Sequence, residues 1–131
     1  MMSIDEALGR YAEAVQDLSS AGLALAAGTF FNCADLCNQA VEKMLQAVYV
    51  LRHDSPAPYD HDLRALGTLV GAPESVVADL DALNPYHPEA YLASRAPDEA
   101  DDAVGPETAD ELLQAARRVM RWVRPIIFES H

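Results

Sequence analysis

The sequence has little positive charge, few aromatic side chains and only two cysteines. It contains 21 Asp and Glu residues against 9 Lys and Arg, which gives a formal net charge of −12, and Lys43 is its only lysine. Because so acidic a surface repels a phosphate backbone, we expect no extended binding to duplex DNA. The charge is compatible with a saline cytoplasm or with a basic partner, and composition does not choose between them.

Long hydrophobic runs are also absent. No stretch approaches the roughly 20 apolar residues of a membrane-spanning helix, and the N-terminus lacks the basic-then-apolar order of a signal peptide. We therefore expect a cytoplasmic protein without membrane contact. The 131 residues correspond to one domain, 1–131. Since half of the residues are hydrophobic but only 7% are aromatic, the core must consist mainly of Ala, Leu and Val, which favours close helix packing.

The spacing of apolar residues predicts an all-α fold. We expect an up-and-down helical bundle with two long antiparallel helices, two short helices and one long C-terminal helix. The first long helix is predicted over residues 3–27, with Ser3 as its N-cap and Gly28 as its stop. Its apolar row comprises Ile4, Leu8, Tyr11, Val15, Leu18, Gly22 and Leu25.

The second long helix, predicted over residues 29–52, is apolar on more than one side. This surface exceeds what one seam of a bundle needs, so we expect the helix to be the centre of the fold and the protein to be a homodimer. A narrow polar strip remains, and its members could line the dimer interface or face solvent: Asp35, Gln39, Glu42, Lys43 and Gln46.

The rest of the chain divides at its prolines and glycines. Asp60 is a candidate cap for a short helix that Gly71 ends, and Pro73 opens a second short helix to residue 83. Residues 84–106 are predicted to be a long loop with a helical turn near 89–93. The last helix starts at Pro106 and should kink or end at Pro125, whose ring removes a backbone donor.

Cys33 and Cys37 lie four residues apart on the second helix. This geometry does not favour a disulfide, so the pair is predicted to be two buried thiols. Together with His53, His61 and His87 they could supply metal ligands, but no C-x-x-C or H-x-x-x-H pair is present. We therefore expect no metal and no other cofactor.

Three motifs follow one another in the chain: Gln39-Ala40-Val41-Glu42-Lys43, His61-Asp62-Leu63, and Tyr91 to Arg95 followed by Pro97-Asp98. In this order and at these separations they resemble the prokaryotic HEPN family of small helical domains. The resemblance covers nearly the whole chain. It implies a nucleotide- or RNA-associated, typically dimeric domain, in many cases encoded beside a minimal nucleotidyltransferase with which it forms a toxin–antitoxin pair.

Two groups of residues are candidates for binding a nucleotide or another anion. Arg117 and Arg121, with Arg118 and Arg124 nearby, form a cluster of positive charge on the last helix, although arginines at a helix C-terminus also suit the helix dipole. The second group, which the resemblance singles out, consists of His61, Asp62, Tyr91 and Arg95. Capping by Asp62 and pinning of the loop by Arg95 are the structural alternatives.

Catalysis is a separate question. Many HEPN ribonucleases carry an R-x(4 to 6)-H pair, and Arg124 and His131 have this spacing, with Pro125 between them. Arg95 and His61 are a second pair for a metal-independent endoribonuclease. Because Pro125 interrupts the first pair, we expect little or no ribonuclease activity. The sequence therefore favours a non-catalytic interaction module that binds a nucleotide, RNA or a nucleotidyltransferase, with an endoribonuclease toxin or a structural subunit without ligand as alternatives.

Overall fold

A computed structural model describes residues 2–58, 60–87 and 104–129, and the side chains from residue 4 onward. Within these ranges the chain forms five α-helices and one 3-10 helix, and no strand is present. The elements are α1 (Met2–Ala27), α2 (Phe30–His53), α3 (Leu63–Leu69), α4 (Glu74–Leu83), η1 (Asn84–Tyr86) and α7 (Pro106–Glu129). The predicted all-α bundle, with two long helices, two short ones and a long last helix, is confirmed.

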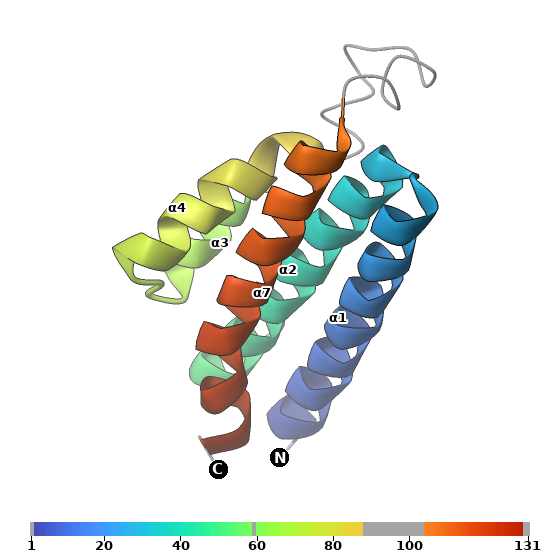
Figure 1. The fold of residues 1–131 in the computed structure, drawn as a ribbon. Coiled ribbons are helices and arrows are strands. Elements are labelled where there is room, and N and C mark those ends of the chain that lie inside the picture. Colours follow the sequence, from blue (N-terminus) through green and yellow to red (C-terminus); the bar gives the residue numbers. More distant parts are fainter. Residues whose placement is uncertain (1, 59, 88–103, 130–131) are drawn as a thin grey trace.

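The long helices lie side by side (Figure 1). α1 runs antiparallel to α2, and α7 runs in the same direction as α2, so that the start of α1 and the end of α7 lie at one end of the bundle. The short helices α3 and α4 pack against α2 and α7 on the side away from α1. In the described part of the chain, no helix is long and apolar enough to cross a membrane.

Alanine dominates the buried face of α1. Ala7, Ala14, Ala21 and Ala24 are buried together with Tyr11 and Leu18. The predicted apolar row was wrong at Val15, which is 41% exposed, because small alanine side chains rather than the larger ones line the seam and allow α1 to lie close to α2. Ser3 was also wrongly predicted as the N-cap, since α1 begins at Met2 and includes it.

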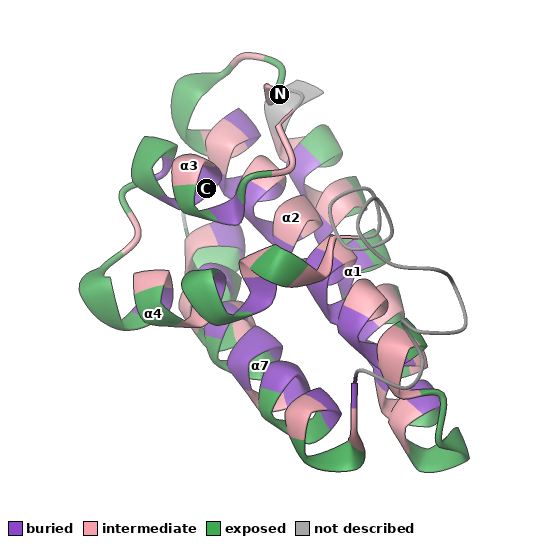
Figure 2. Cartoon of the chain, turned by 90° about the horizontal axis from the view of Figure 1, so that it is seen from above, coloured by how far each residue is buried: buried purple, intermediate pink, exposed green. Residues whose placement is uncertain are grey.

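α2 is the centre of the fold, as predicted. Its buried residues lie along several sides of the helix, and α2 contacts α1, α7 and the short helices α3 and α4 within the same chain. Figure 2 colours the buried residues of these helices. The extra apolar surface that suggested a homodimer is therefore covered inside one chain. The homodimer stays a prediction, and it requires a different surface.

Polar side chains fix the start of α3 and the end of α4. The side chain of Asp62 caps α3 by accepting hydrogen bonds from the backbone N–H groups of Arg64 and Ala65. Asp60 was wrongly predicted as the cap, because its side chain instead accepts from the backbone N–H of Asp62. Fully buried Asn38 of α2 donates to the backbone carbonyl of Leu83, at the end of α4.

α7 continues through Pro125 to Glu129, so the helix does not end at this proline. Pro125 is exposed, and the carbonyl that loses its backbone donor is that of Arg121, also an exposed residue, so water can take the place of the missing hydrogen bond. The buried face of the helix consists of Ala109, Leu112, Leu113, Ala115, Ala116, Val119, Val123 and Ile127. The helical turn predicted near residues 89–93 lies outside the described residues.

Candidate functional site

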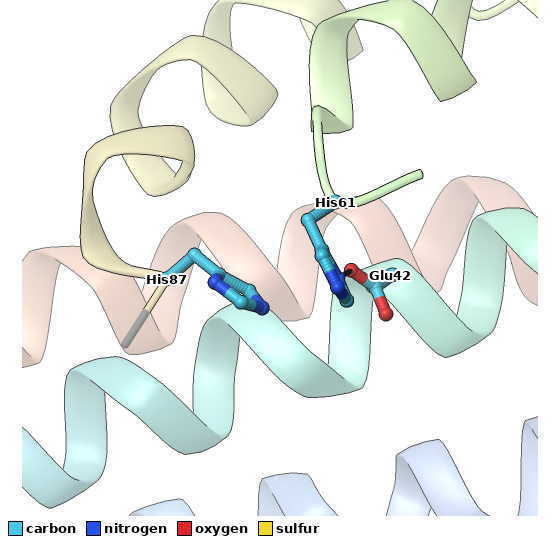
Figure 3. A group of neighbouring side chains, drawn as sticks. All are labelled: Glu42, His61 and His87. Atoms are coloured by element: carbon cyan, nitrogen blue, oxygen red, sulfur yellow. Dashed lines mark hydrogen bonds and ion pairs between the residues drawn. The ribbon is translucent and has the colours of Figure 1, made fainter. Parts of the chain in front are cut away.

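Glu42, His61 and His87 come together on the surface of α2 (Figure 3). Nδ1 of His61 lies 2.7 Å from Oε1 of Glu42, at hydrogen-bonding distance. The rings of His61 and His87 lie close together, with centroids 4.1 Å apart and planes inclined by 31°. All three side chains are partly buried, and one potential ligand atom from each lies within 4.8 Å of those from the other two.

Three separate segments supply these side chains. Glu42 lies in the middle of α2, His61 just before the Asp62 cap of α3, and His87 just after η1. Asn84 joins the last two segments, because its side chain accepts from the backbone N–H of Leu63 and donates to the Asp62 carboxylate, both at 3.0 Å. The hydrogen bonds of Asn84 thus bring His87, three residues further on, against His61.

Further charges of α2 lie near this cluster. Asp35 precedes Glu42 by two helical turns, and the pKa of its carboxyl is raised by burial, while a hydrogen bond from Gln39 and the nearby His87 partly oppose the rise. Lys43 pairs with Asp17 of α1 at 2.8 Å. Gln46 accepts a hydrogen bond from Arg10. The polar strip of α2 is therefore paired largely within the chain.

The other residues that the sequence offered as metal ligands lie apart from this cluster. Cys33 and Cys37 are fully buried free thiols, as predicted. The contact with Cys33 and burial together raise the pKa of the Cys37 thiol, so it stays protonated. His53 stacks on Tyr49 at the end of α2, with ring centroids 4.3 Å apart.

Sequence reasoning missed the three-residue cluster. His61 and His87 are separated by all of α3 and α4, and Glu42 stands a further 19 residues before His61, so no local spacing links them. Metal motifs read from sequence depend on ligands placed close together on one element. Only the folding of the α3–α4 pair onto α2 joins these three side chains.

Of the predicted anion-binding group with His61, the structure describes only His61 and Asp62. His61 faces the Glu42 carboxylate and Asp62 is occupied as a helix cap, whereas Tyr91, Arg95 and His131 lie outside the described residues. The role of His61 and Arg95 as an anion-binding pair, and that of Arg124 and His131 as a catalytic pair, therefore stay predictions.

The arginines of α7 divide into two kinds. Arg118 makes an ion pair with Asp79 of α4. Arg117, Arg121 and Arg124 are exposed, and no carboxylate in the described part of the chain makes an ion pair with any of them. Three arginine charges on one helix are thus left open to an external anion.

Comparison with known proteins agrees with this architecture. The HEPN domain family matches residues 8–126. The archaeal HEPN homologue ST0689 shares the fold with a TM-score of 0.79 at 21% identity, over 93% of this chain and 98% of its own. TT1696 from Thermus thermophilus gives a TM-score of 0.79 at 22% identity, over 92% and 98%. No curated protein sequence matches the chain. The family match spans nearly the whole bundle, and the chain therefore belongs to the HEPN domain family.

Proposed function

We propose that this protein is a non-catalytic HEPN interaction module that binds the phosphates of a nucleotide or of single-stranded RNA. The observation that carries the proposal is the row of Arg117, Arg121 and Arg124 on α7, exposed and without an ion-pair partner among the described residues. On a chain with a formal net charge of −12, unpaired arginines are the places where an anion is attracted.

The spacing of these arginines suits an extended ligand. Residues 117, 121 and 124 repeat at four and three along α7, so their side chains share one face and span about 10 Å along the helix axis. Each guanidinium can contact phosphate oxygens through two N–H groups. Because the rest of the surface is acidic, a short single strand that meets α7 alone is favoured over a duplex that would also meet acidic surface.

We further propose a homodimer that uses the surface between α1 and α7. Val15 of α1 and Phe128 of α7 are 41% and 52% exposed, and they line one shallow groove together with Met120 and Arg124. Exposed apolar side chains gathered on adjacent helices favour a protein contact. A second copy on this surface would place Arg124 of each chain at the interface.

The partner in this proposal is a minimal nucleotidyltransferase, with which the protein forms a toxin–antitoxin pair. The support is the family membership together with an acidic surface suited to a basic partner. Co-expression with a nucleotidyltransferase encoded beside the gene, followed by purification of one tagged chain, should recover both proteins in a fixed ratio. Recovery of the tagged chain alone would contradict this part of the proposal.

An endoribonuclease is the alternative, and one observation favours it. The sequence predicted that Pro125 interrupts the helix after Arg124. Instead, α7 continues past Pro125 to Glu129. Incubation of the purified protein with a structured RNA tests this alternative. We expect little or no cleavage; robust cleavage that is lost in both Arg124→Ala and a variant without His131 would make the protein an enzyme.

Fluorescence anisotropy with a labelled single-stranded RNA tests the binding proposal. We expect the affinity to fall as salt rises, and the double variant Arg117→Ala/Arg121→Ala to bind at least about tenfold more weakly, because two phosphate contacts are lost. Arg64→Ala on α3 is the matched control, since it removes an exposed arginine that is paired with Asp81. Because Arg64→Ala removes one charge, it is compared with the single variant Arg121→Ala. Equal weakening of RNA binding by these two variants would show that only net charge matters and would contradict the proposed site.

A further inference from the structure

We propose that Glu42, His61 and His87 bind one divalent transition-metal ion, with Zn²⁺ as the best match. The site is independent of the arginines of α7 and goes beyond the proposed function. It lies across the junction of α2, the start of α3 and the end of η1 (Figure 3).

The donor set selects the class of metal. Two imidazoles and one carboxylate suit Zn²⁺, Fe²⁺, Ni²⁺ or Cu²⁺, whereas Mg²⁺ and Ca²⁺ prefer oxygen ligands throughout. Two histidines and one glutamate are also a ligand set found at zinc centres that keep one coordination position open. Among the described residues, this is the group in which three such side chains present their ligand atoms to one another.

The geometry is close to that of an occupied site. Ligand atoms about 2.0–2.2 Å from one ion in a tetrahedral site lie about 3.4 Å from each other. His61 Nδ1 and Glu42 Oε1 are already 2.7 Å apart, and every ligand atom of the cluster lies within 4.8 Å of the others. Coordination therefore requires these two atoms to separate by about 0.7 Å and the more distant ligand atoms to approach by at most about 1.4 Å, which side-chain rotation can supply.

The surrounding charge favours a cation. Glu42 supplies one negative charge, and Asp35 lies on the same face of α2, close enough to His87 to interact with it electrostatically. The two imidazoles, with ring centroids 4.1 Å apart, would repel each other if both were positively charged. A metal ion binds both in the neutral form, and it takes the place of the hydrogen bond between His61 and Glu42.

An ion in this position would act as a clamp. It would connect the middle of α2 to the segments that precede α3 and follow η1, which are otherwise joined through Asn84. Three protein ligands also leave one coordination position for water or for an oxygen of an anion. The sequence carries no signal for this clamp, because its ligands come from three segments.

Titration of the full chain with metal tests the proposal. The protein is first freed of metal with a chelator and then titrated with Zn²⁺ by calorimetry and with Co²⁺ by visible absorption. We expect one ion per chain, a rise in the melting temperature with Zn²⁺, and a Co²⁺ spectrum typical of four or five ligands without a thiolate charge-transfer band.

Variants assign the ligands. Glu42→Gln and His87→Phe should each weaken Zn²⁺ binding by more than about tenfold, since loss of a ligand costs at least as much as loss of an outer-shell partner. His87→Phe keeps a ring against His61, so it separates coordination from packing. His53→Phe, at the far end of α2, is the control and should leave binding unchanged. The proposal is overturned if no ion binds at micromolar Zn²⁺, or if Glu42→Gln and His87→Phe bind as tightly as the wild type.

Discussion

Arg118 of α7 holds the Asp79 carboxylate of α4 through three hydrogen bonds of 3.0–3.2 Å, made by its Nε and Nη2 atoms. The side chain of Asp79 is 14% exposed, so this pair is partly removed from solvent. The hydrogen bond to Asp79 also raises the pKa of the Arg118 guanidinium, which keeps the charge of the pair fixed. Of the four arginines near the end of α7, Arg118 therefore has a structural role that its neighbours lack.

This difference predicts unequal effects of two similar substitutions. Arg118→Ala should lower the free energy of unfolding by about 1 kcal/mol, the upper end of the range for such pairs, because it breaks a two-pronged contact between α4 and α7. Arg121→Ala should change it by less than about 0.5 kcal/mol, as expected for an exposed site. Urea denaturation followed by circular dichroism measures both. A larger loss of stability in Arg121→Ala than in Arg118→Ala would contradict the assignment.

Two glycines predict opposite effects of the same change. A Cβ added at Gly67 of α3 would collide with Cδ1 of Leu80, which is fully buried, so Gly67→Ala should destabilise by about 1–3 kcal/mol. A Cβ at Gly9 of α1 meets no atom within 4 Å, so Gly9→Ala should stabilise by about 0.5–1 kcal/mol through helix propensity. Thermal melts of the two variants beside the wild type suffice; stabilisation by Gly67→Ala would mean that α3 and α4 pack less closely than the structure shows.

The carboxyl of Asp35 predicts a dependence of stability on pH. Burial raises its pKa above the ordinary value of 3.8, so the folded chain binds this proton more tightly than the unfolded chain. The contribution of this group to the free energy of unfolding is therefore largest at low pH, and it falls as pH rises from about 3.8 through the raised folded value.

Asp35→Asn removes this charge and keeps an oxygen that can accept from Gln39. The variant should be more stable than the wild type at pH 7, and the difference should shrink as pH falls towards the ordinary value of 3.8. Chemical denaturation at a series of pH values measures the difference. A variant less stable than the wild type at pH 7 would show that the hydrogen bond, and not burial of the charge, dominates at this position.

The proposed dimer surface predicts a change of oligomeric state. Phe128→Glu places a charge in the groove between α1 and α7 and should convert a dimer to a monomer. Leu69→Glu on α3 is the matched control, because Leu69 is 47% exposed on another part of the molecule. Light scattering at micromolar concentration should give twice the chain mass for the wild type and for Leu69→Glu. A monomeric wild type would contradict the homodimer itself.

Most of the fold could be predicted from the sequence because long helices carry strong periodic signals. The stop at Gly28, which has a φ of +83°, and the start of α4 after Pro73 are local signals of the same kind. The burial of α1 was harder to predict, since alanine carries little hydrophobic contrast and Val15 looks like a core residue. Pro125 shows the limit of a local rule: the rule predicted that the helix kinks or ends there, and the helix continues to Glu129 with the proline on its exposed side.

The candidate sites were less accessible to sequence reasoning. The positions of the arginines along the last helix predicted the arginine cluster. The pairing of Arg118 with Asp79, however, depends on how α4 packs against α7. His61 was recognised from its motif, yet its neighbours Glu42 and His87 are brought to it only by tertiary folding. Pairings between distant segments are the information that one sequence does not contain.

The proposed function depends above all on whether α7 presents its unpaired arginines to phosphates. An NMR titration of ¹⁵N-labelled protein with a short single-stranded RNA is the decisive measurement, because it reports position as well as affinity. We expect shifts concentrated on α7 around Arg117 and Arg121, including their Nε–H signals, and their loss in the double alanine variant. Shifts concentrated instead at His61 and His87, or no shift at millimolar RNA in low salt, would contradict the proposal.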